Sequence, residues 1–210
     1  PYVEQGALFT ALNPEGTTIP PTQPSTGTTG VQTTLSIYTC PSSSGPKLNA
    51  NRGFHGTSNY IAILGPAPAA GTGFTFAQFT QAGGCLFGNS AVRINTISDG
   101  TSNTVLVGER AYQTVAGQAY NGAIWSGLYE AERVAANMWW MGGTTAAAHT
   151  DHRIQARNAS ASVWSTSSAH GAGVNFVFGD GSVRMLTDGI AQAVQANLAA
   201  RADGQVLGDF

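Results

Sequence analysis

A chain of 210 residues can bury one substantial core, which predicts a single domain, with or without insertions. Charged residues make up only 10% of the chain, against about 25% in average soluble proteins, and the formal net charge is -2. The composition therefore excludes a protein that binds nucleic acid through a basic surface, and no apolar run approaches the length of a membrane span.

The first residues predict the last turns of a helix. Residues 2–13 carry apolar side chains at helical spacing, namely Val3, Ala7, Leu8, Ala11 and Leu12. The pattern has no N-cap, which fits a helix that continues upstream of residue 1, and Pro14 ends it. Residues 14–34 are rich in Thr, Pro and Gly and predict an extended surface loop.

Two apolar runs in the middle of the chain predict buried strands. The first covers residues 59–64, and the second covers residues 104–109 after a turn at 98–103. Residues 111–165 predict a loop-rich, variable insertion with short strands. This insertion holds all four tryptophans, Trp125, Trp139, Trp140 and Trp164. Adjacent rings point to opposite sides of a strand, which favours a subunit contact for Trp139 or Trp140.

Residues 168–186 predict a β-hairpin. Val174, Phe176 and Phe178 alternate with other residues, as in a half-buried strand. Asp180-Gly181 is a preferred two-residue type I′ turn. That turn pairs Phe178 with Val183 and Phe176 with Met185, and it places these four side chains on one face with Arg184 on the other.

A helix is predicted after the hairpin, near residues 190–201. Asp188 is suited to cap its N-terminus. Ile190, Val194 and Leu198 form one apolar stripe, which predicts the face that packs on the core.

Four stretches, taken together, resemble a known bacterial family. They are Pro1-Tyr2-Val3-Glu4-Gln5, Cys40-Pro41-Ser42, the block from Asp99-Gly100-Thr101-Ser102-Asn103 to Gly108-Glu109, and His170 with Asp180-Gly181 nine residues further on. In this order they resemble the prepilin-type H-x9-D-G family, a domain of unknown function that is loosely labelled solute-binding. The resemblance runs from residue 1 to the tail at 201–210, although residues 111–165 match none of its blocks.

The resemblance implies a pilin-like α+β fold, with an N-terminal helix packed on an antiparallel β-sheet head with long loops. Members of the family begin with a leader, which a membrane peptidase trims, and a long hydrophobic helix. The block at residues 1–5 would follow that helix. The whole chain, 1–210, would then be one outward-facing globular head that begins at the end of the helix.

The motif residues are expected to be structural. His170 packs at the base of the hairpin, Asp180 and Gly181 supply the turn, and no nucleophile in the sequence pairs with His170. Asp99, Asn103 and Glu109 offer oxygen ligands, and pseudopilin heads often carry calcium. However, Asp99-Gly100 and Ser102-Asn103 are also plain turn chemistry, and the spacing is not that of an EF-hand loop.

Other candidate sites have less support in the sequence. His149-Thr150-Asp151-His152 would need further ligands to bind zinc. A Cys40–Cys85 disulfide is left open, because two cysteines do not establish a redox compartment. No G-x-S-x-G motif, Walker loop or dinucleotide loop occurs, so neither an enzyme nor a cofactor is expected.

The leading functional hypothesis is a structural subunit of a pilus-like filament, extracellular or at the cell surface. Its partners would be copies of itself and the assembly machinery, and it would reach the membrane only through the upstream helix. A surface with so little charge favours self-association, and the head contacts are expected at residues 14–34 and in the tryptophan-rich region. The alternative is an anchored module that binds a glycan or solute through its tryptophans. An exported hydrolase would require His170 to lie beside a nucleophile in a pocket.

Overall fold

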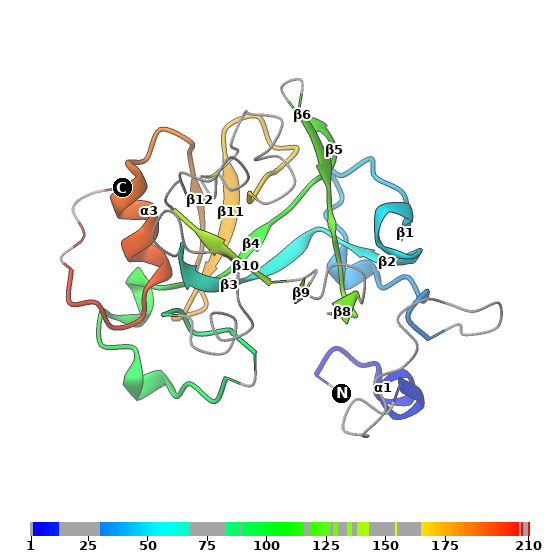
Figure 1. Cartoon of the computed structure of the whole chain (residues 1–210), viewed down its shortest axis with the longest axis horizontal. Helices are drawn as coiled ribbons and strands as arrows, with labels where there is room; N and C mark the ends of the chain where they lie inside the picture. Colours follow the sequence, from blue (N-terminus) through cyan, green and yellow to red (C-terminus); the bar gives the residue numbers. More distant parts are fainter. Residues whose placement is uncertain are drawn as a thin grey trace.

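Five strands form the central sheet of the protein, which we describe from a computed structural model (Figure 1). Their order is β10-β3-β4-β11-β12; β10 runs parallel to β3, and all other neighbours are antiparallel. The strands are β3 (Tyr60–Pro66), β4 (Val105–Glu109), β10 (Met138–Met141), β11 (Val174–Phe178) and β12 (Val183–Leu186). The α+β class and the strands predicted at 59–64 and 104–109 are confirmed.

Shorter elements surround this sheet. Strands β1 (Leu48–Asn49), β2 (His55–Ser58) and β7 (Ala123–Ile124) form a second sheet, and two hairpins pair β5 (Tyr112–Val115) with β6 (Gln118–Asn121) and β8 (Leu128–Tyr129) with β9 (Val134–Ala135). The 3-10 turns are η1 (Ser36–Tyr38), η2 (Ala50–Arg52), η3 (Ile94–Thr96) and η4 (Thr101–Asn103). The structure describes residues 2–12, 30–67, 83–88, 90–115, 118–126, 128–129, 134–135, 138–142, 154, 165–205, 207 and 210.

Helix α3 (Gln192–Ala199) covers the central sheet and packs against β3, β4 and β10 (Figure 1). Its Leu198 and Ala199 are fully buried with apolar side chains of the strands. The buried cluster holds Ile61, Ile63, Leu64, Val105, Ala123, Met141, Ile154, Val174, Phe176, Phe178, Leu186, Leu198 and Ala199. At Gly142 (φ 68°), a Cβ would overlap the backbone of Ala196, so a glycine is required where α3 meets the end of β10.

The predicted C-terminal helix is confirmed, but its predicted cap is wrong. Val194 packs against the core and Leu198 is buried within it, as the apolar stripe indicated. The N-cap is Ala191, and no side chain caps the helix. A turn in which the Ile190 N–H bonds the Thr187 carbonyl lies between Asp188 and the helix, so Asp188 sits too early in the chain to act as the cap.

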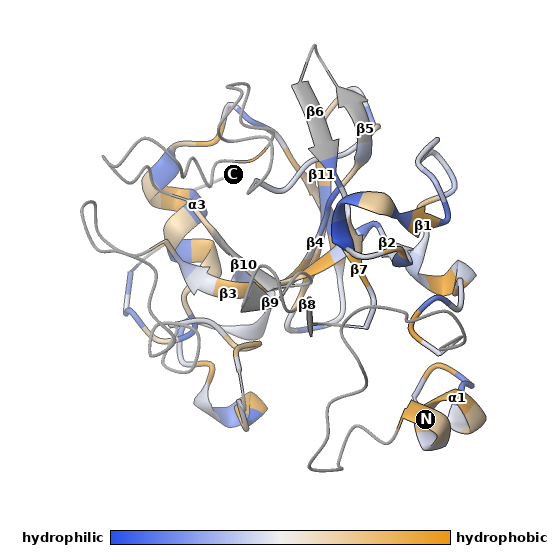
Figure 2. Cartoon of the chain, turned by 45° about the vertical axis from the view of Figure 1, so that its right-hand side comes forward, coloured by the Kyte–Doolittle hydropathy of each residue, from blue (hydrophilic) through white to orange (hydrophobic). Residues whose placement is uncertain are grey.

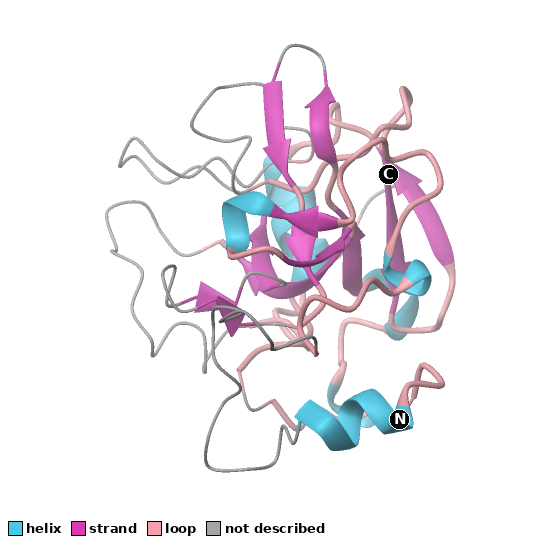
Figure 3. Ribbon diagram, turned by 90° about the vertical axis from the view of Figure 1, so that its right-hand side faces the viewer, coloured by secondary structure: helices cyan, strands magenta, loops and turns pink. Residues whose placement is uncertain are grey.

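Helix α1 (Gly6–Leu12) is shorter than the predicted helix and lies apart from the central sheet. Residues 2–5 are not helical, and Glu4 has a positive φ of 59°. Figure 3 shows α1 at one end of the molecule, and in Figure 2 most of its ribbon has hydrophobic colouring. Of the helices in the described residues, α3 packs on the sheet, whereas the resemblance implied an N-terminal helix there.

Strands β11 and β12 form the predicted hairpin, but the predicted register is wrong by one residue. Val177 pairs with Val183 and Phe176 with Arg184. The connection is a three-residue loop at 179–181, closed by a hydrogen bond from the Gly181 N–H to the Phe178 carbonyl (3.0 Å). Gly181 has a positive φ of 84° and Asp180 does not, so the turn cannot be type I′, which needs both.

A one-residue slip moves every side chain of the slipped strand to the opposite face. Phe176 and Phe178 are buried as predicted, but Val183 is 63% exposed and Met185 is 45% exposed. Arg184 was predicted on the opposite face and instead lies over Phe178, with its guanidinium carbon 4.4 Å from the ring centre. The prediction that all four apolar side chains share one face is wrong for β12.

Residues 111–165 contribute to the core of the fold through β10, which lies along β3, and through the buried Met141 and Ile154. Trp125 is half-buried. The side chains of Trp139, Trp140 and Trp164 lie outside the described residues, as do most of the predicted loop at 14–34 and the whole His149–His152 segment. Among the helices of the described ranges, none is both long enough and apolar enough to cross a membrane.

Candidate functional site

Three side chains from distant parts of the chain meet beside the end of β4. Cys40 Sγ lies 3.6 Å from Nε2 of His170, and the same nitrogen lies 3.4 Å from Oε1 of Glu109. All three donor atoms lie within 4.8 Å of one another. Cys40 and Glu109 are buried, and the side chain of His170 is 31% exposed. The cluster therefore has one side that faces solvent.

Cys40 is held by a polar turn that follows η1. Its backbone N–H donates to Oδ1 of Asn59 (3.0 Å), and its carbonyl accepts from the Ser43 N–H (2.9 Å). The Asn59 amide also donates to the Ser43 hydroxyl (3.1 Å) and to the Arg110 carbonyl (3.2 Å). The turn at Pro41 and this buried amide together fix the thiol beside the end of β4.

Glu109 is the last residue of β4, and its two oxygens have different roles. Oε2 accepts a hydrogen bond from the backbone N–H of Asn175 in β11 (3.0 Å). Oε1 faces His170. The carboxylate is therefore oriented by a backbone donor, which leaves one oxygen for a partner in the cluster.

His170 is positioned by a polar segment that runs beside the end of β4. The Ser167 N–H donates to the Glu109 carbonyl (3.0 Å), and the Ala111 N–H donates to the Ser167 carbonyl (3.0 Å). The His170 N–H then donates to the Ser168 hydroxyl (3.1 Å). These hydrogen bonds hold the segment before the hairpin, which includes His170, beside Glu109.

The charges of the cluster also act on Tyr60, which is the cross-strand partner of Glu109. Burial raises the pKa of the Tyr60 hydroxyl, and the negative charges of Cys40 and Glu109 raise it further. A small cavity of about 10 Å³ adjoins Cys40, Glu109, Ser167 and Ser168, and Arg110 also lines it. A space of this size holds about one water-sized species, which leaves no room for an organic substrate.

The expectation that no nucleophile pairs with His170 is wrong, because Cys40 lies beside it. The geometry is nevertheless not that of a catalytic triad. In a triad the base contacts the nucleophile through one ring nitrogen and its orienting carboxylate through the other. Here the thiol and the carboxylate both face Nε2 of His170. Three donors that surround one point are typical of a metal-binding set.

The predicted calcium ligands do not form one site. The Asp99 carboxylate accepts hydrogen bonds from the backbone N–H groups of Asp203 (2.7 Å) and Gly204 (3.0 Å). The Asn103 amide donates to the Asp99 carbonyl (3.1 Å), as in a turn. Asp99 therefore ties the turn before η4 to the C-terminal segment, while Glu109 faces Cys40 and His170.

The other predicted motif residues stabilise turns of the backbone. Gly100 has a positive φ of 96° in the turn before η4, and Asp180 accepts a hydrogen bond from the Ser182 N–H (2.9 Å) at the hairpin loop.

Cys40 and Cys85 are both free and buried, so the Cys40–Cys85 disulfide is not formed. Burial raises the pKa of the Cys85 thiol, and the nearby Arg201 opposes this effect.

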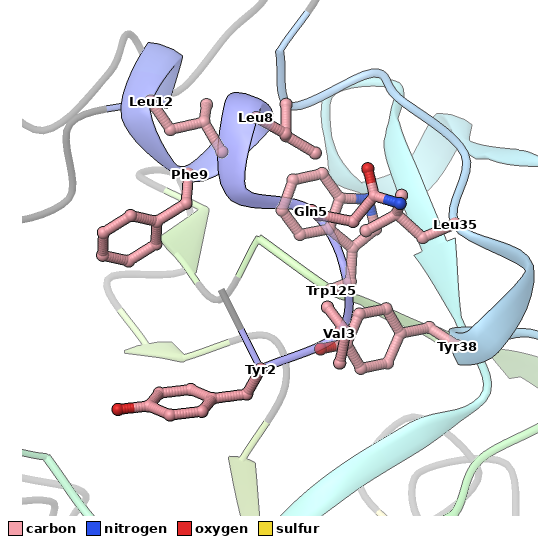
Figure 4. Close-up of a pocket in the computed structure, with 9 residues that line it drawn as sticks. All are labelled: Tyr2, Val3, Gln5, Leu8, Phe9, Leu12, Leu35, Tyr38 and Trp125. Atoms are coloured by element: carbon pink, nitrogen blue, oxygen red, sulfur yellow. The ribbon is translucent and has the colours of Figure 1, made fainter.

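A second feature is an apolar groove of about 270 Å³ between α1 and the body of the protein. Figure 4 shows Leu8 and Leu12 of α1 on one side and Trp125 and Tyr38 on the other. The Trp125 indole N–H donates to the Thr33 carbonyl (2.7 Å), which fixes the ring at the groove wall. The groove is smaller than most sites for small molecules, which span about 300–1,000 Å³.

Sequence reasoning missed the cluster because its members lie far apart in the chain; His170 follows Cys40 by 130 positions. One signal was present. Cys40, Glu109 and His170 each belong to a different one of the blocks that carry the family resemblance.

Comparisons with known proteins identify the family but not the activity. The profile of a family described as a protein of unknown function (DUF1559) matches residues 1–193. Neither the search of curated proteins nor that of solved structures found a match. Because the matched region covers most of the 210 residues, the chain belongs to the DUF1559 family.

Proposed function

We propose that the chain is the outward-facing head of a pilin-like subunit that assembles into a filament, extracellular or at the cell surface. The observation that carries the proposal is the position of α1. This helix has no buried residue, lies apart from the central sheet and presents apolar side chains beside a groove. In a filament, a neighbouring copy of the chain would cover them.

The exposed apolar side chains near the N-terminus support a contact between subunits. Tyr2 is fully exposed, Phe9 is 37% exposed and Ile37 in η1 is 60% exposed. Burial of one large apolar side chain contributes about 1.5–3 kcal/mol to association. The low content of charged residues, 10%, removes much of the repulsion that keeps copies apart.

The resemblance to the prepilin-type family supports the same proposal. In that family, a leader and a long hydrophobic helix precede the head, and packing of these helices drives assembly. The subunit would be a structural protein rather than an enzyme, with further copies and the assembly machinery as its partners. Head contacts at residues 14–34 and in the tryptophan-rich region would add to the packing of the helices.

Electron microscopy of the natural full-length gene product tests the proposal. Cells that produce it should release regular filaments with one subunit repeat. The combined substitution Tyr2→Ser and Phe9→Ser should weaken assembly at least tenfold, since about 1.4 kcal/mol corresponds to a factor of ten. Val183→Ser on β12, which also changes an exposed apolar side chain, is the control and should assemble normally. Dispersed monomers from the unchanged protein would contradict the proposal.

The groove supports a second candidate, an anchored head that binds a glycan or solute. Trp125 is half-buried at the groove wall, and an aromatic face suits a sugar ring. Tryptophan fluorescence measured against a panel of glycans should then change with one of them, and Trp125→Leu should remove the change. An unaltered spectrum with every glycan would count against this candidate.

A further inference from the structure

The Cys40–Glu109–His170 cluster combines a thiol, a carboxylate and an imidazole around one point. We propose that these three side chains bind a divalent cation of the zinc class, with a fourth position open to water. The proposal does not rest on filament assembly. It concerns a site on the head that would be present in a single chain.

Two of the three donor–donor distances match edges of a zinc tetrahedron, and the third lies within 4.8 Å. Typical Zn–S and Zn–N bonds of about 2.3 Å and 2.0–2.1 Å place S and N about 3.5–3.6 Å apart at tetrahedral angles. Cys40 Sγ and His170 Nε2 lie 3.6 Å apart. With Zn–O bonds of about 2.0–2.2 Å, the same calculation for N and O gives about 3.3–3.5 Å, and Nε2 of His170 lies 3.4 Å from Oε1 of Glu109.

Hydrogen bonding alone satisfies this arrangement less well than a cation does. A ring nitrogen of neutral histidine carries either one proton or one lone pair, so Nε2 can make a direct bond to only one of its two neighbours. A cation at the centre would accept lone pairs from all three groups at once. Thiolate and imidazole ligands favour zinc over calcium or magnesium, which prefer oxygen.

The ligands are held in place by groups outside the cluster. The Asn175 N–H orients the Glu109 carboxylate, and the Asn59 amide holds the backbone of Cys40. Such supporting hydrogen bonds are typical of metal sites, where they orient the ligands. The adjoining cavity of about 10 Å³ has room for one water-sized species, and the partial exposure of His170 gives access from solvent.

The charges near the site favour a cation. Two of the three ligands, the Cys40 thiolate and the Glu109 carboxylate, bind a cation as anions. Arg110 lines the same cavity and offsets part of this charge. Once the Cys40 thiolate has formed on binding, the thiolate and the Glu109 carboxylate together outweigh the single positive charge of Arg110. On binding, Cys40 would lose its proton to solvent, so metal uptake releases a proton.

A bound ion would join three segments that are distant in sequence. It would link the turn after η1 to the end of β4 and to the start of the hairpin. Backbone hydrogen bonds already join the start of the hairpin to the end of β4, and the Asn59 side chain links the turn after η1 to the same place. Metal binding would therefore stabilise a preformed arrangement, because the ion binds the folded state and not the unfolded chain.

The test is a metal titration of the 210-residue chain after treatment with a chelator. Zinc should bind with one equivalent per chain, raise the unfolding temperature and release a proton. Cobalt in place of zinc should give the intense visible bands of tetrahedral coordination and a thiolate charge-transfer band. Cys40→Ser, Glu109→Gln and His170→Gln should each weaken binding at least about 100-fold, since loss of a supporting group alone costs about 10–100-fold.

Two features keep the test decisive. Cys85→Ser changes the other buried cysteine and should bind zinc as the unchanged chain does. Glu109→Gln retains an oxygen for the Asn175 N–H, and His170 is partly exposed, so circular dichroism should show both variants to be folded. The proposal is overturned if zinc fails to bind at one equivalent, or if folded Cys40 and His170 variants bind it as tightly as the unchanged chain.

Discussion

Asp180 illustrates how much one residue decides at the hairpin loop. Its carboxylate accepts a hydrogen bond from the Ser182 N–H, and Arg184 lies 3.9 Å from its other oxygen. The Ser182 hydroxyl and backbone N–H lower the pKa of Asp180, and the positive charge of Arg184 lowers it further. Of the two Ser182 groups, the backbone N–H lies at hydrogen-bonding distance from the carboxylate, 2.9 Å. The motif aspartate therefore closes the loop and does not face the His170 cluster.

The lowered pKa sets the direction of a pH effect. The stabilisation from the Asp180 carboxylate should be fully present above the unfolded-state pKa of about 3.9 and lost as the pH falls through the lower folded-state value. An NMR titration should place the pKa of Asp180 below the usual range. Because the backbone N–H of Ser182 remains in both variants, neither Ser182→Ala nor Arg184→Gln should remove this lowering completely. An ordinary pKa in Arg184→Gln would show that the ion pair dominates instead.

At the scale of elements, the hairpin shows why alternation does not determine register. Both registers keep Phe176 and Phe178 on the buried face of β11, so the pattern of that strand is equally satisfied. They differ on β12, where Val183 and Met185 are exposed and Leu186 is buried. The three-residue loop with Gly181 in the left-handed region selects the observed register.

Alanine substitutions distinguish the two registers. Phe176→Ala should lower the free energy of unfolding by about 3–5 kcal/mol, because it opens a cavity in the core. Val183→Ala should change it by less than about 0.5 kcal/mol, because the side chain is exposed. Urea unfolding measures both. A cost for Val183→Ala comparable to that of a core residue would favour the two-residue turn.

At the scale of the whole molecule, α3 ties the C-terminal part of the chain to the sheet and to the 111–165 region. Gln195 is fully buried in this helix. Its Oε1 accepts a hydrogen bond from the Ile154 N–H (3.0 Å), and its Nε2 donates to the Ile190 carbonyl (2.7 Å). One polar side chain thus connects three parts of the fold.

Removal of that side-chain amide should be costly. Gln195→Leu leaves the buried Ile154 N–H without its partner, at about 1–3 kcal/mol, and the partly buried Ile190 carbonyl without its partner, at the lower end of that range. The free energy of unfolding in urea should therefore fall by about 2–4 kcal/mol. Gln192→Leu at the start of the same helix, where the side chain is only partly buried, is the matched control. Equal stability of the two variants would contradict this role of Gln195.

Much of the fold could be predicted because its signals are local. Apolar runs identified β3 and β4, alternation identified β11, and the stripe with Leu198 identified α3. The errors arose where two local sequence signals conflicted, or where a contact with a neighbouring segment determined the local structure. Asp180-Gly181 suits more than one loop length, and Asp188 suits a cap although a turn precedes the helix. The pairing of β10 with β3 depends on a contact between strands more than 70 residues apart.

The sequence by itself determined the α+β class, the position of the hairpin and the family to which the chain belongs, because spacing and short motifs carry that information. The tertiary structure alone decided that Cys40, Glu109 and His170 meet. No local pattern reports their approach, since it depends on how β3, β4 and β11 pair and on the hydrogen bonds of Asn59 and Ser167. The separation of α1 from the sheet was decided in the same way, because an apolar stripe shows that a helix has a face to bury but not which surface will bury it.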